Sequence, residues 1–114
     1  MKLTIFYIDD EPMICENFHD EFESDDLDIR TFVNPDEAIS EATKSPPSLI
    51  FIDYRFPRAT GETVANALPP NIPKVLVSGD LNIRTKYNFL AVLSKPASSD
   101  DIWQIINNER QKAL

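Results

Sequence analysis

Residues 49–54 read Leu-Ile-Phe-Ile-Asp-Tyr, four apolar side chains in a row followed by an acid. A nearly continuous apolar run of this length is typical of a β-strand buried on both faces, as in a parallel sheet between two layers of helices. An acid at the end of such a strand is a poor choice for packing alone. Asp53 is therefore a candidate functional residue.

The rest of the chain repeats this strand pattern between helix-like segments. Four further apolar runs of strand length are Leu3–Ile8, Leu27–Val33, Lys74–Val77 and Leu90–Leu93. From amphipathic spacing and cap residues we expect helices at Pro12 to about Glu23, Asn34 to about Lys44, Gly61–Leu68, within Leu81–Asn88, and from Ser98 or Ser99 onward. The fourth of these has neither a cap nor clear periodicity. Alternating strands and helices predict an α/β fold with a parallel sheet, and the absence of repeats or linkers predicts one domain over residues 1–114.

The composition of the chain excludes several functions. The chain has 114 residues, 42% of them hydrophobic, which is enough for the core of one domain. Acidic residues outnumber basic ones by 19 to 11, and residues 1–30 alone carry a net charge of −8. Such a chain is a poor candidate for binding nucleic acid, and no stretch approaches the roughly 20 apolar residues that span a membrane. The first residues are typical of a strand rather than a signal peptide, so we expect a cytoplasmic protein.

Cysteine and histidine are scarce. Cys15 is the only cysteine, which excludes an internal disulfide. Cys15 and His19 are the only residues of these two types, and structural zinc sites need four ligands, so a zinc site of such ligands is excluded as well. The two lie one helical turn apart, and we expect both to be ordinary surface residues.

Polar residues end four of the predicted strands. They are Asp9-Asp10-Glu11 after the first, Asp53 at the end of the third, Ser78 after the fourth and Lys95-Pro96 after the fifth. Each group apart from Asp53, taken alone, is explained as well or better by a turn at the end of a strand. In a parallel sheet, however, the carboxyl ends of the strands share one edge, and ligands bind there. We therefore expect these residues to converge.

Three carboxylates and one ammonium group make a specific chemical combination. Like charges at close range disfavour ionisation, so Asp9, Asp10 and Asp53 need compensating positive charge. Mg²⁺ together with Lys95 supplies it, and Mg²⁺ prefers oxygen ligands from one or two carboxylates and a phosphoryl group. Asp53 is then placed as a nucleophile toward phosphorus, giving an aspartyl phosphate. Lys95 would stabilise charge on the transferring oxygens, and Ser78 would donate a hydrogen bond to the product.

In this combination and order, the residues resemble the receiver domain of bacterial two-component response regulators, over essentially the whole chain. The matching features are Asp9-Asp10-Glu11, Asp53 followed by Pro57 and Gly61, Ser78, and Lys95-Pro96. The resemblance implies a flavodoxin-like, doubly wound sheet of five parallel strands in the order 2-1-3-4-5. It also implies a phosphoacceptor domain rather than an enzyme. Asp53 would be phosphorylated by a histidine kinase, a histidine phosphotransfer protein or a small phosphodonor, and the domain would signal to a downstream protein by contact.

The resemblance assigns further roles within the site. It implies that Mg²⁺ is held by Asp10, Asp53 and the backbone carbonyl of Arg55, with Asp9 acting through water. Ser78 and Lys95 would contact the phosphoryl group and relay its presence. One departure is that Arg55 stands where the family often has a small polar residue, while Asp80 lies two residues past Ser78. Our hypothesis is that Arg55 and Asp80 pair across the mouth of the site and slow the attack of water on the phosphoryl group.

Two more departures bear on signalling. Val92 stands three residues before Lys95, where the family usually has an aromatic switch residue, which argues against relay by rotation of an aromatic ring. The intervals from Asp53 to Ser78 and from Ser78 to Lys95 are shorter than usual, which predicts short or irregular third and fourth helices. A phosphorylation-independent pseudo-receiver that only binds partners is therefore an alternative. A Mg²⁺-dependent phosphohydrolase is disfavoured because Arg55 stands where phosphatases of the haloacid-dehalogenase type carry a second acid.

Overall fold

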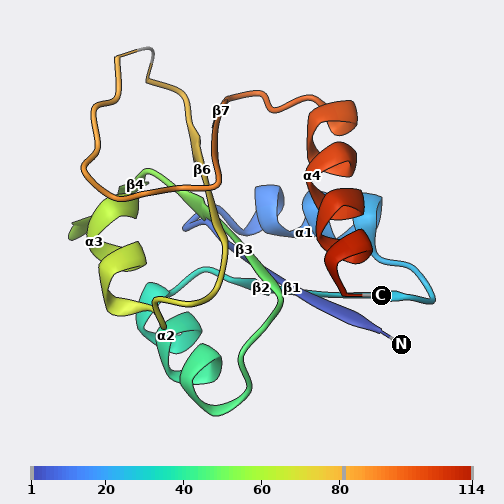
Figure 1. Cartoon of the computed structure of the whole chain (residues 1–114). Helices are drawn as coiled ribbons and strands as arrows, with labels where there is room; N and C mark the ends of the chain where they lie inside the picture. Colours follow the sequence, from blue (N-terminus) through green and yellow to red (C-terminus); the bar gives the residue numbers. More distant parts are fainter. Residues whose placement is uncertain (1, 81, 114) are drawn as a thin grey trace.

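The computed structural model describes residues 2–80 and 82–113, which form a five-stranded sheet with helices on both faces (Figure 1). The strands of this sheet are β1 (Leu3–Ile8), β2 (Leu27–Phe32), β3 (Leu49–Asp53), β6 (Lys74–Ser78) and β7 (Ala91–Ser94). All neighbours are parallel, in the order β2-β1-β3-β6-β7. Counted within this sheet alone the order is 2-1-3-4-5, so the predicted flavodoxin-like fold is confirmed. Two short strands that were not predicted, β4 (Arg55–Phe56) and β5 (Ala59–Thr60), pair as a separate antiparallel hairpin.

Four helices connect or follow the strands: α1 (Pro12–Phe22), α2 (Pro35–Lys44), α3 (Gly61–Ala67) and α4 (Ser99–Lys112). Their first residues agree with the predicted caps. The Asn34 side chain accepts the Asp36 N–H at 2.9 Å, and the Ser98 hydroxyl accepts the Asp101 N–H at 3.0 Å. Within residues 2–80 and 82–113, every helix is too short or too polar to cross a membrane.

The sheet is covered on both faces, which explains its apolar runs. In Figure 1, α1 and α4 lie on one face of the sheet, and α2 and α3 lie on the other. Leu49 and Phe51 of β3 pack toward α1 and α4, whereas Ile50 and Ile52 pack toward α2 and α3. All four side chains are fully buried. A strand with two buried faces needs apolar residues at successive positions, as the sequence of β3 has.

The helix predicted within Leu81–Asn88 is absent from the described residues. Residues 82–90 contain no helix, and Leu81 lies outside the described part of the chain. The segment instead runs beside α3, where the Glu62 carboxylate accepts hydrogen bonds from the Thr85 hydroxyl and, at 3.1 Å, from the Lys86 N–H. The prediction of a short third helix is confirmed. The fourth helix was expected to be short or irregular, and residues 82–88 form no helix.

Cys15 is not the surface residue that was expected. Its side chain is 3% exposed, and its thiol donates a hydrogen bond to the Asp9 carbonyl at 3.2 Å. Burial, followed by the charge of Asp9, raises the pKa of the thiol to about 11, so it stays protonated as a donor. His19 on the same helix is partly exposed, as expected. The buried face of α1 therefore comprises Cys15, Phe18 and Phe22, whereas Ile14 is only partly buried.

Candidate functional site

The carboxyl edge of the sheet gathers most of the predicted site residues. Asp9 directly follows β1, Asp53 is the last residue of β3, Ser78 is the last residue of β6, and Lys95 directly follows β7. Carboxylate oxygens of Asp9, Asp10 and Asp53 lie within 4.8 Å of one another. The convergence expected from a parallel sheet is therefore present for the three acids.

Lys95 joins two of these acids. Its ammonium nitrogen lies 3.0 Å from Asp9 Oδ2 and 2.9 Å from Asp53 Oδ1. Asp9 is fully buried, Asp53 is 7% exposed and the Lys95 side chain is 25% exposed, so both contacts are partly shielded from water and less screened than ion pairs between fully exposed groups. Because Lys95 and Asp9 are 86 positions apart in the sequence, only the folded sheet brings them together.

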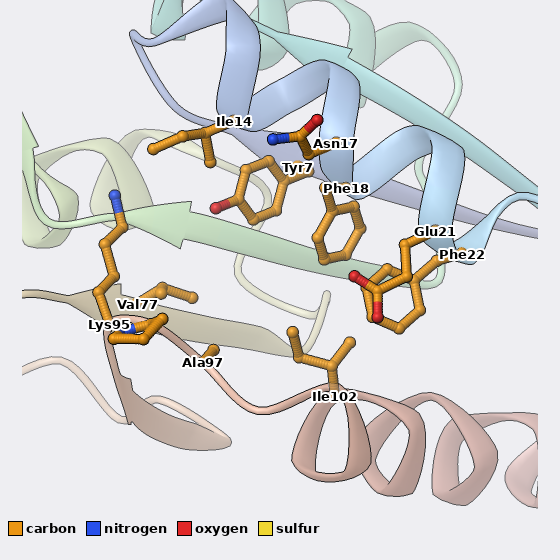
Figure 2. Close-up of a pocket in the computed structure, with 11 residues that line it drawn as sticks. Tyr7, Ile14, Asn17, Phe18, Glu21, Phe22, Val77, Lys95, Ala97 and Ile102 are labelled. Atoms are coloured by element: carbon orange, nitrogen blue, oxygen red, sulfur yellow. The ribbon is translucent and has the colours of Figure 1, made fainter.

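Asp9 is held by the backbone N–H of Glu11 and by the Tyr7 hydroxyl, and the sequence did not mark Tyr7 as functional. Asp9 Oδ1 accepts the Glu11 N–H at 3.0 Å, and Asp9 Oδ2 accepts the Tyr7 hydroxyl at 3.4 Å. Burial and the charges of Asp9 and Asp53 raise the pKa of Tyr7, so its hydroxyl keeps the proton that it donates. Figure 2 shows the Tyr7 hydroxyl and the Lys95 ammonium at the same end of a pocket beside this site. In the sequence Tyr7 looked like one more core residue of a buried strand, so no signal set it apart.

Crowding changes the ionisation of the site. Burial raises the pKa of the Asp53 carboxyl, and the nearby charge of Asp9 adds to the rise, while the hydrogen bond from Lys95 offsets part of it. Burial acts to lower the pKa of Lys95, but hydrogen bonds to Asp53 and Asp9 outweigh it, so this pKa is raised. The Lys95 ammonium, shared by two carboxylates, thus stays charged. Its single positive charge offsets only part of the effects that raise the pKa of Asp53. The electrostatics of the site favour a further cation.

The end of the strand that carries Asp53 is packed closely against α3. The Gly61 N–H donates to the Tyr54 carbonyl at 2.6 Å. A Cβ atom at Gly61 would lie 2.5 Å from Leu76 Cδ1 and 2.6 Å from the Asp53 carbonyl oxygen, closer than carbon atoms can approach either. Glycine is therefore required here by close packing, and this packing fixes the backbone that positions Asp53.

Ser78 belongs to a chain of contacts that reaches the surface. It follows Val77, which is paired with Asp53 in the sheet, and its Oγ accepts the Asp80 N–H at 3.0 Å. Asp80 Oδ2 lies 2.7 Å from the Arg55 guanidinium, so the ion pair expected from the sequence is present. The side chains of Arg55 and Asp80 are 75% and 36% exposed, which makes this a surface pair that solvent screens.

The donor atoms fit a divalent cation. Asp9, Asp10 and Asp53 offer only oxygen atoms, and Asp10 is accessible to solvent. Oxygen-only sites with a small number of carboxylates suit Mg²⁺, which keeps several of its water ligands. Burial is the main cause of the raised pKa of Asp53 and the charge of Asp9 adds to it, so a cation bound beside both carboxylates would favour the ionised form of Asp53.

The fold and site define a flavodoxin-like α/β protein with an acidic cluster and a lysine at the carboxyl edge of the sheet. The chain belongs to the response regulator receiver domain family, which it matches over residues 5–107. That family is one of signalling domains. No match to this chain was found among curated proteins.

Solved structures of receiver domains share this fold. A response regulator receiver domain from Clostridium thermocellum is 24% identical, with a TM-score of 0.84 and coverage of 98% of each chain. A Francisella response regulator receiver domain is 20% identical, with a TM-score of 0.86 over 99% of this chain and 100% of the other. The response regulator protein TrrA from Thermotoga maritima, solved in complex with Mg²⁺ and BeF, is 22% identical, with a TM-score of 0.82 over 96% and 99% of the two chains. At these identities the similarity shows the fold alone.

Proposed function

We propose that this chain is a cytoplasmic phosphoacceptor receiver domain of a two-component or phosphorelay system, one domain over residues 1–114, and that Asp53 is the residue phosphorylated. The observation that carries the proposal is the joining of Asp53 to Lys95 at 2.9 Å beside two further aspartates. A histidine kinase or a histidine phosphotransfer protein would supply the phosphoryl group. A downstream protein would recognise the phosphorylated domain by contact.

Each residue of the site would have its own role in phosphoryl transfer. An ionised carboxylate oxygen of Asp53 would form the new bond to phosphorus while the bond from phosphorus to the donor atom breaks, and the donor leaves with that electron pair. Lys95 would pair with oxygens of the transferred group. The Ser78 oxygen accepts a hydrogen bond from the Asp80 N–H, and its own O–H would donate one to the phosphoryl group.

The acidic cluster would hold Mg²⁺. Asp10, Asp53 and the backbone carbonyl of Arg55 would be direct ligands, with Asp9 acting through water. When bound, the ion supplies positive charge that offsets the carboxylates and the transferred phosphoryl oxygens. The Thermotoga maritima relative, which has the same fold, was solved in complex with Mg²⁺ and BeF, and this supports the proposal of Mg²⁺ as the ion but not the choice of individual ligands.

A binding-only pseudo-receiver is the second candidate. Residues 82–90 contain no helix, and Val92, where the family usually has an aromatic switch residue, is 53% exposed. Both features alter the region that would relay phosphorylation. A phosphohydrolase has less support, because the residue two positions past Asp53 is a basic one, and its guanidinium pairs with Asp80.

Intact-mass spectrometry after incubation with Mg²⁺ and acetyl phosphate distinguishes these candidates. We expect the mass to increase by one phosphoryl group, and the Asp53→Asn variant to show no increase. No adduct on the wild-type chain would contradict the proposal and favour the pseudo-receiver. Repeated turnover of a phosphate ester without a stable adduct would favour the phosphohydrolase.

A further inference from the structure

A pocket lies between α1 and α4, with Tyr7 and Lys95 in its lining (Figure 2). Its volume is about 460 Å³, within the range of small-molecule sites. Its walls are largely apolar and come from both helices and the sheet: Ile14, Phe18, Phe22, Val77, Ala97 and Ile102. A preformed pocket of this size and composition suits a small apolar or aromatic group.

The packing of the two helices explains why the pocket stays open. α1 and α4 meet through the rings of Phe22 and Trp103, whose centroids are 5.0 Å apart in an edge-to-face arrangement. A hydrogen bond from the Ser99 hydroxyl to the Glu21 carboxylate also joins the two helices. Ala97, which precedes α4, presents only a methyl group to the pocket. Space therefore remains above Tyr7 and Val77.

The charged groups of the pocket differ in how far they are compensated. Lys95 is paired with both Asp9 and Asp53, so its positive charge is already balanced. Glu21 accepts the hydrogen bond from Ser99, and within the described residues no basic side chain lies within 4.0 Å of its carboxylate. Figure 2 shows this carboxylate directed from α1 over the pocket, close to Phe22. The uncompensated charge at the pocket is therefore negative.

We infer that this pocket binds a small amphiphilic amine, with its apolar body between α1 and α4 and its ammonium group beside Glu21. The largely apolar lining suits such a body, and the Glu21 carboxylate supplies the opposite charge for an ammonium group. The Tyr7 ring forms part of the pocket wall while its hydroxyl contacts Asp9, so Tyr7 would connect a bound amine to the acidic site. The inference concerns binding and does not depend on phosphorylation of Asp53.

A pair of probes of similar size and opposite charge tests the inference. The full chain is titrated with 1-naphthylmethylamine and, separately, with 1-naphthylacetate, and binding is followed by shifts of backbone amide signals in NMR spectra. We expect the amine to shift the amides of Phe18, Phe22 and Ile102 and to bind about two- to five-fold more tightly than the anion at low salt, as expected for one partly exposed ion pair. Equal affinity for the two probes would overturn the inference.

Variants separate the pocket from the general acidity of the chain. Glu21→Gln keeps an acceptor for Ser99 but removes the charge, so it should abolish the preference for the amine. Glu16→Gln removes an exposed charge on the same helix away from the pocket lining, so it should leave the preference largely intact. Ala97→Leu should fill the pocket and weaken both probes. Amide shifts spread over the acidic surface, unchanged in Ala97→Leu, would show non-specific attraction of the cation and contradict the inference. The amide shifts of the wild-type chain test the location without any variant.

Discussion

Lys95 supplies one ammonium group to two buried acids, Asp9 and Asp53. One positive charge therefore faces two carboxylates, which leaves repulsion among the acids of the site. The contacts of Lys95 at 3.0 Å to Asp9 and 2.9 Å to Asp53 leave the third acid, Asp10, to solvent and to any cation that binds. Three carboxylates held within 4.8 Å repel one another in the absence of a metal ion. The site is therefore a place where function costs stability.

Removing one of the three charges should stabilise the protein when no metal is bound. In the presence of a chelator, we expect Asp10→Asn to raise the melting temperature by about 2–6 °C, because it relieves this repulsion while keeping the shape of the side chain. Thermal denaturation followed by circular dichroism measures the change. Glu16→Gln, at an exposed position of α1, is the matched control for loss of one acidic charge. An unchanged or lower melting temperature in Asp10→Asn would count against repulsion among the three acids.

The raised pKa of Asp53 predicts how stability depends on pH. A raised native pKa means that the folded protein binds this proton more tightly than the unfolded chain does. The stability contributed by Asp53 is present at low pH and is lost as pH rises from the ordinary pKa of 3.8 through the raised native value. Asp53→Asn removes this loss, so its unfolding free energy should increase relative to wild type through that window and then level off.

Urea denaturation in chelator at a series of pH values measures this difference. Glu16→Gln, measured alongside, controls for loss of one acidic group. A difference between Asp53→Asn and wild type that is independent of pH, or that decreases as pH rises, would contradict the assignment of the raised pKa to Asp53.

The pair between Arg55 and Asp80 gives a kinetic prediction. If the pair, at 2.7 Å, restricts the approach of water, Arg55→Ala should shorten the half-life of the phosphorylated protein by up to about five-fold, the size of effect that a surface ion pair supports. The decay of the mass adduct over time provides the half-life. Arg58→Ala, in the same hairpin turn and also exposed, is the control. An unchanged half-life in Arg55→Ala would exclude this role.

Among the elements, the segment of residues 82–90 shows how a stretch without a helix is nevertheless held in place. Glu62 on α3 accepts hydrogen bonds from Thr85 and Lys86. Lys74, which is 1% exposed, donates to the carbonyls of Pro69 and Ile72 at 2.7 and 2.9 Å, and its ammonium lies 5.3 Å from the centre of the Tyr87 ring. The segment is thus anchored to α3 and to the start of β6.

Loss of the Glu62 anchor should loosen the segment without unfolding the domain. We expect Glu62→Ala to speed hydrogen exchange of the Lys86 amide by roughly ten-fold, because that amide loses a charge-assisted hydrogen bond. Exchange measured by NMR reports this amide directly. Asn66→Ala, at an exposed position of the same helix, should leave the exchange rate unchanged. If Glu62→Ala left it unchanged as well, Glu62 would not be the anchor.

The elements also show what could be predicted from the sequence. All five strands of the main sheet and four helices follow from apolar runs, periodicity and caps such as Asn34 and Ser98. The hairpin of β4 and β5 was missed because strands of two residues carry no apolar pattern. The prediction of a helix within 81–88 was wrong over residues 82–88. This segment is held instead by contacts with Glu62 and Lys74. Both are tertiary contacts, which local patterns do not encode.

The same limit applies to the site. The acids and Lys95 were predictable because they end strands, and a parallel sheet brings strand ends together. The hydrogen bonds of Tyr7 and Cys15 to Asp9 were not predictable, because Tyr7 looks like an ordinary member of an apolar strand and Cys15 like a surface residue of a helix. Gly61 was part of the family resemblance, but only the structure shows that its close approach to the Asp53 carbonyl is the reason for glycine there.

In the whole molecule, the parallel sheet brings acids from distant parts of the sequence together at one edge. The net charge of −8 belongs to residues 1–30, yet only Asp9 and Asp10 of that segment contribute to the acidic cluster. The central acid, Asp53, comes from the remainder of the chain, whose charges balance. We therefore expect phosphorylation to select one carboxylate out of three whose oxygens lie within 4.8 Å of one another.

Locating the phosphoryl group among these carboxylates tests the account most directly. The protein is incubated with Mg²⁺ and acetyl phosphate, the acyl phosphate is reduced with borohydride, and tryptic peptides are analysed by mass spectrometry. The peptide of residues 45–55 contains Asp53 as its only acid, whereas Asp9 and Asp10 lie in the peptide of residues 3–30. We expect the reduced residue in the peptide of residues 45–55 alone, and none after incubation in chelator. Modification in the peptide of residues 3–30, or in neither peptide, would contradict the assignment of Asp53 as the phosphoacceptor.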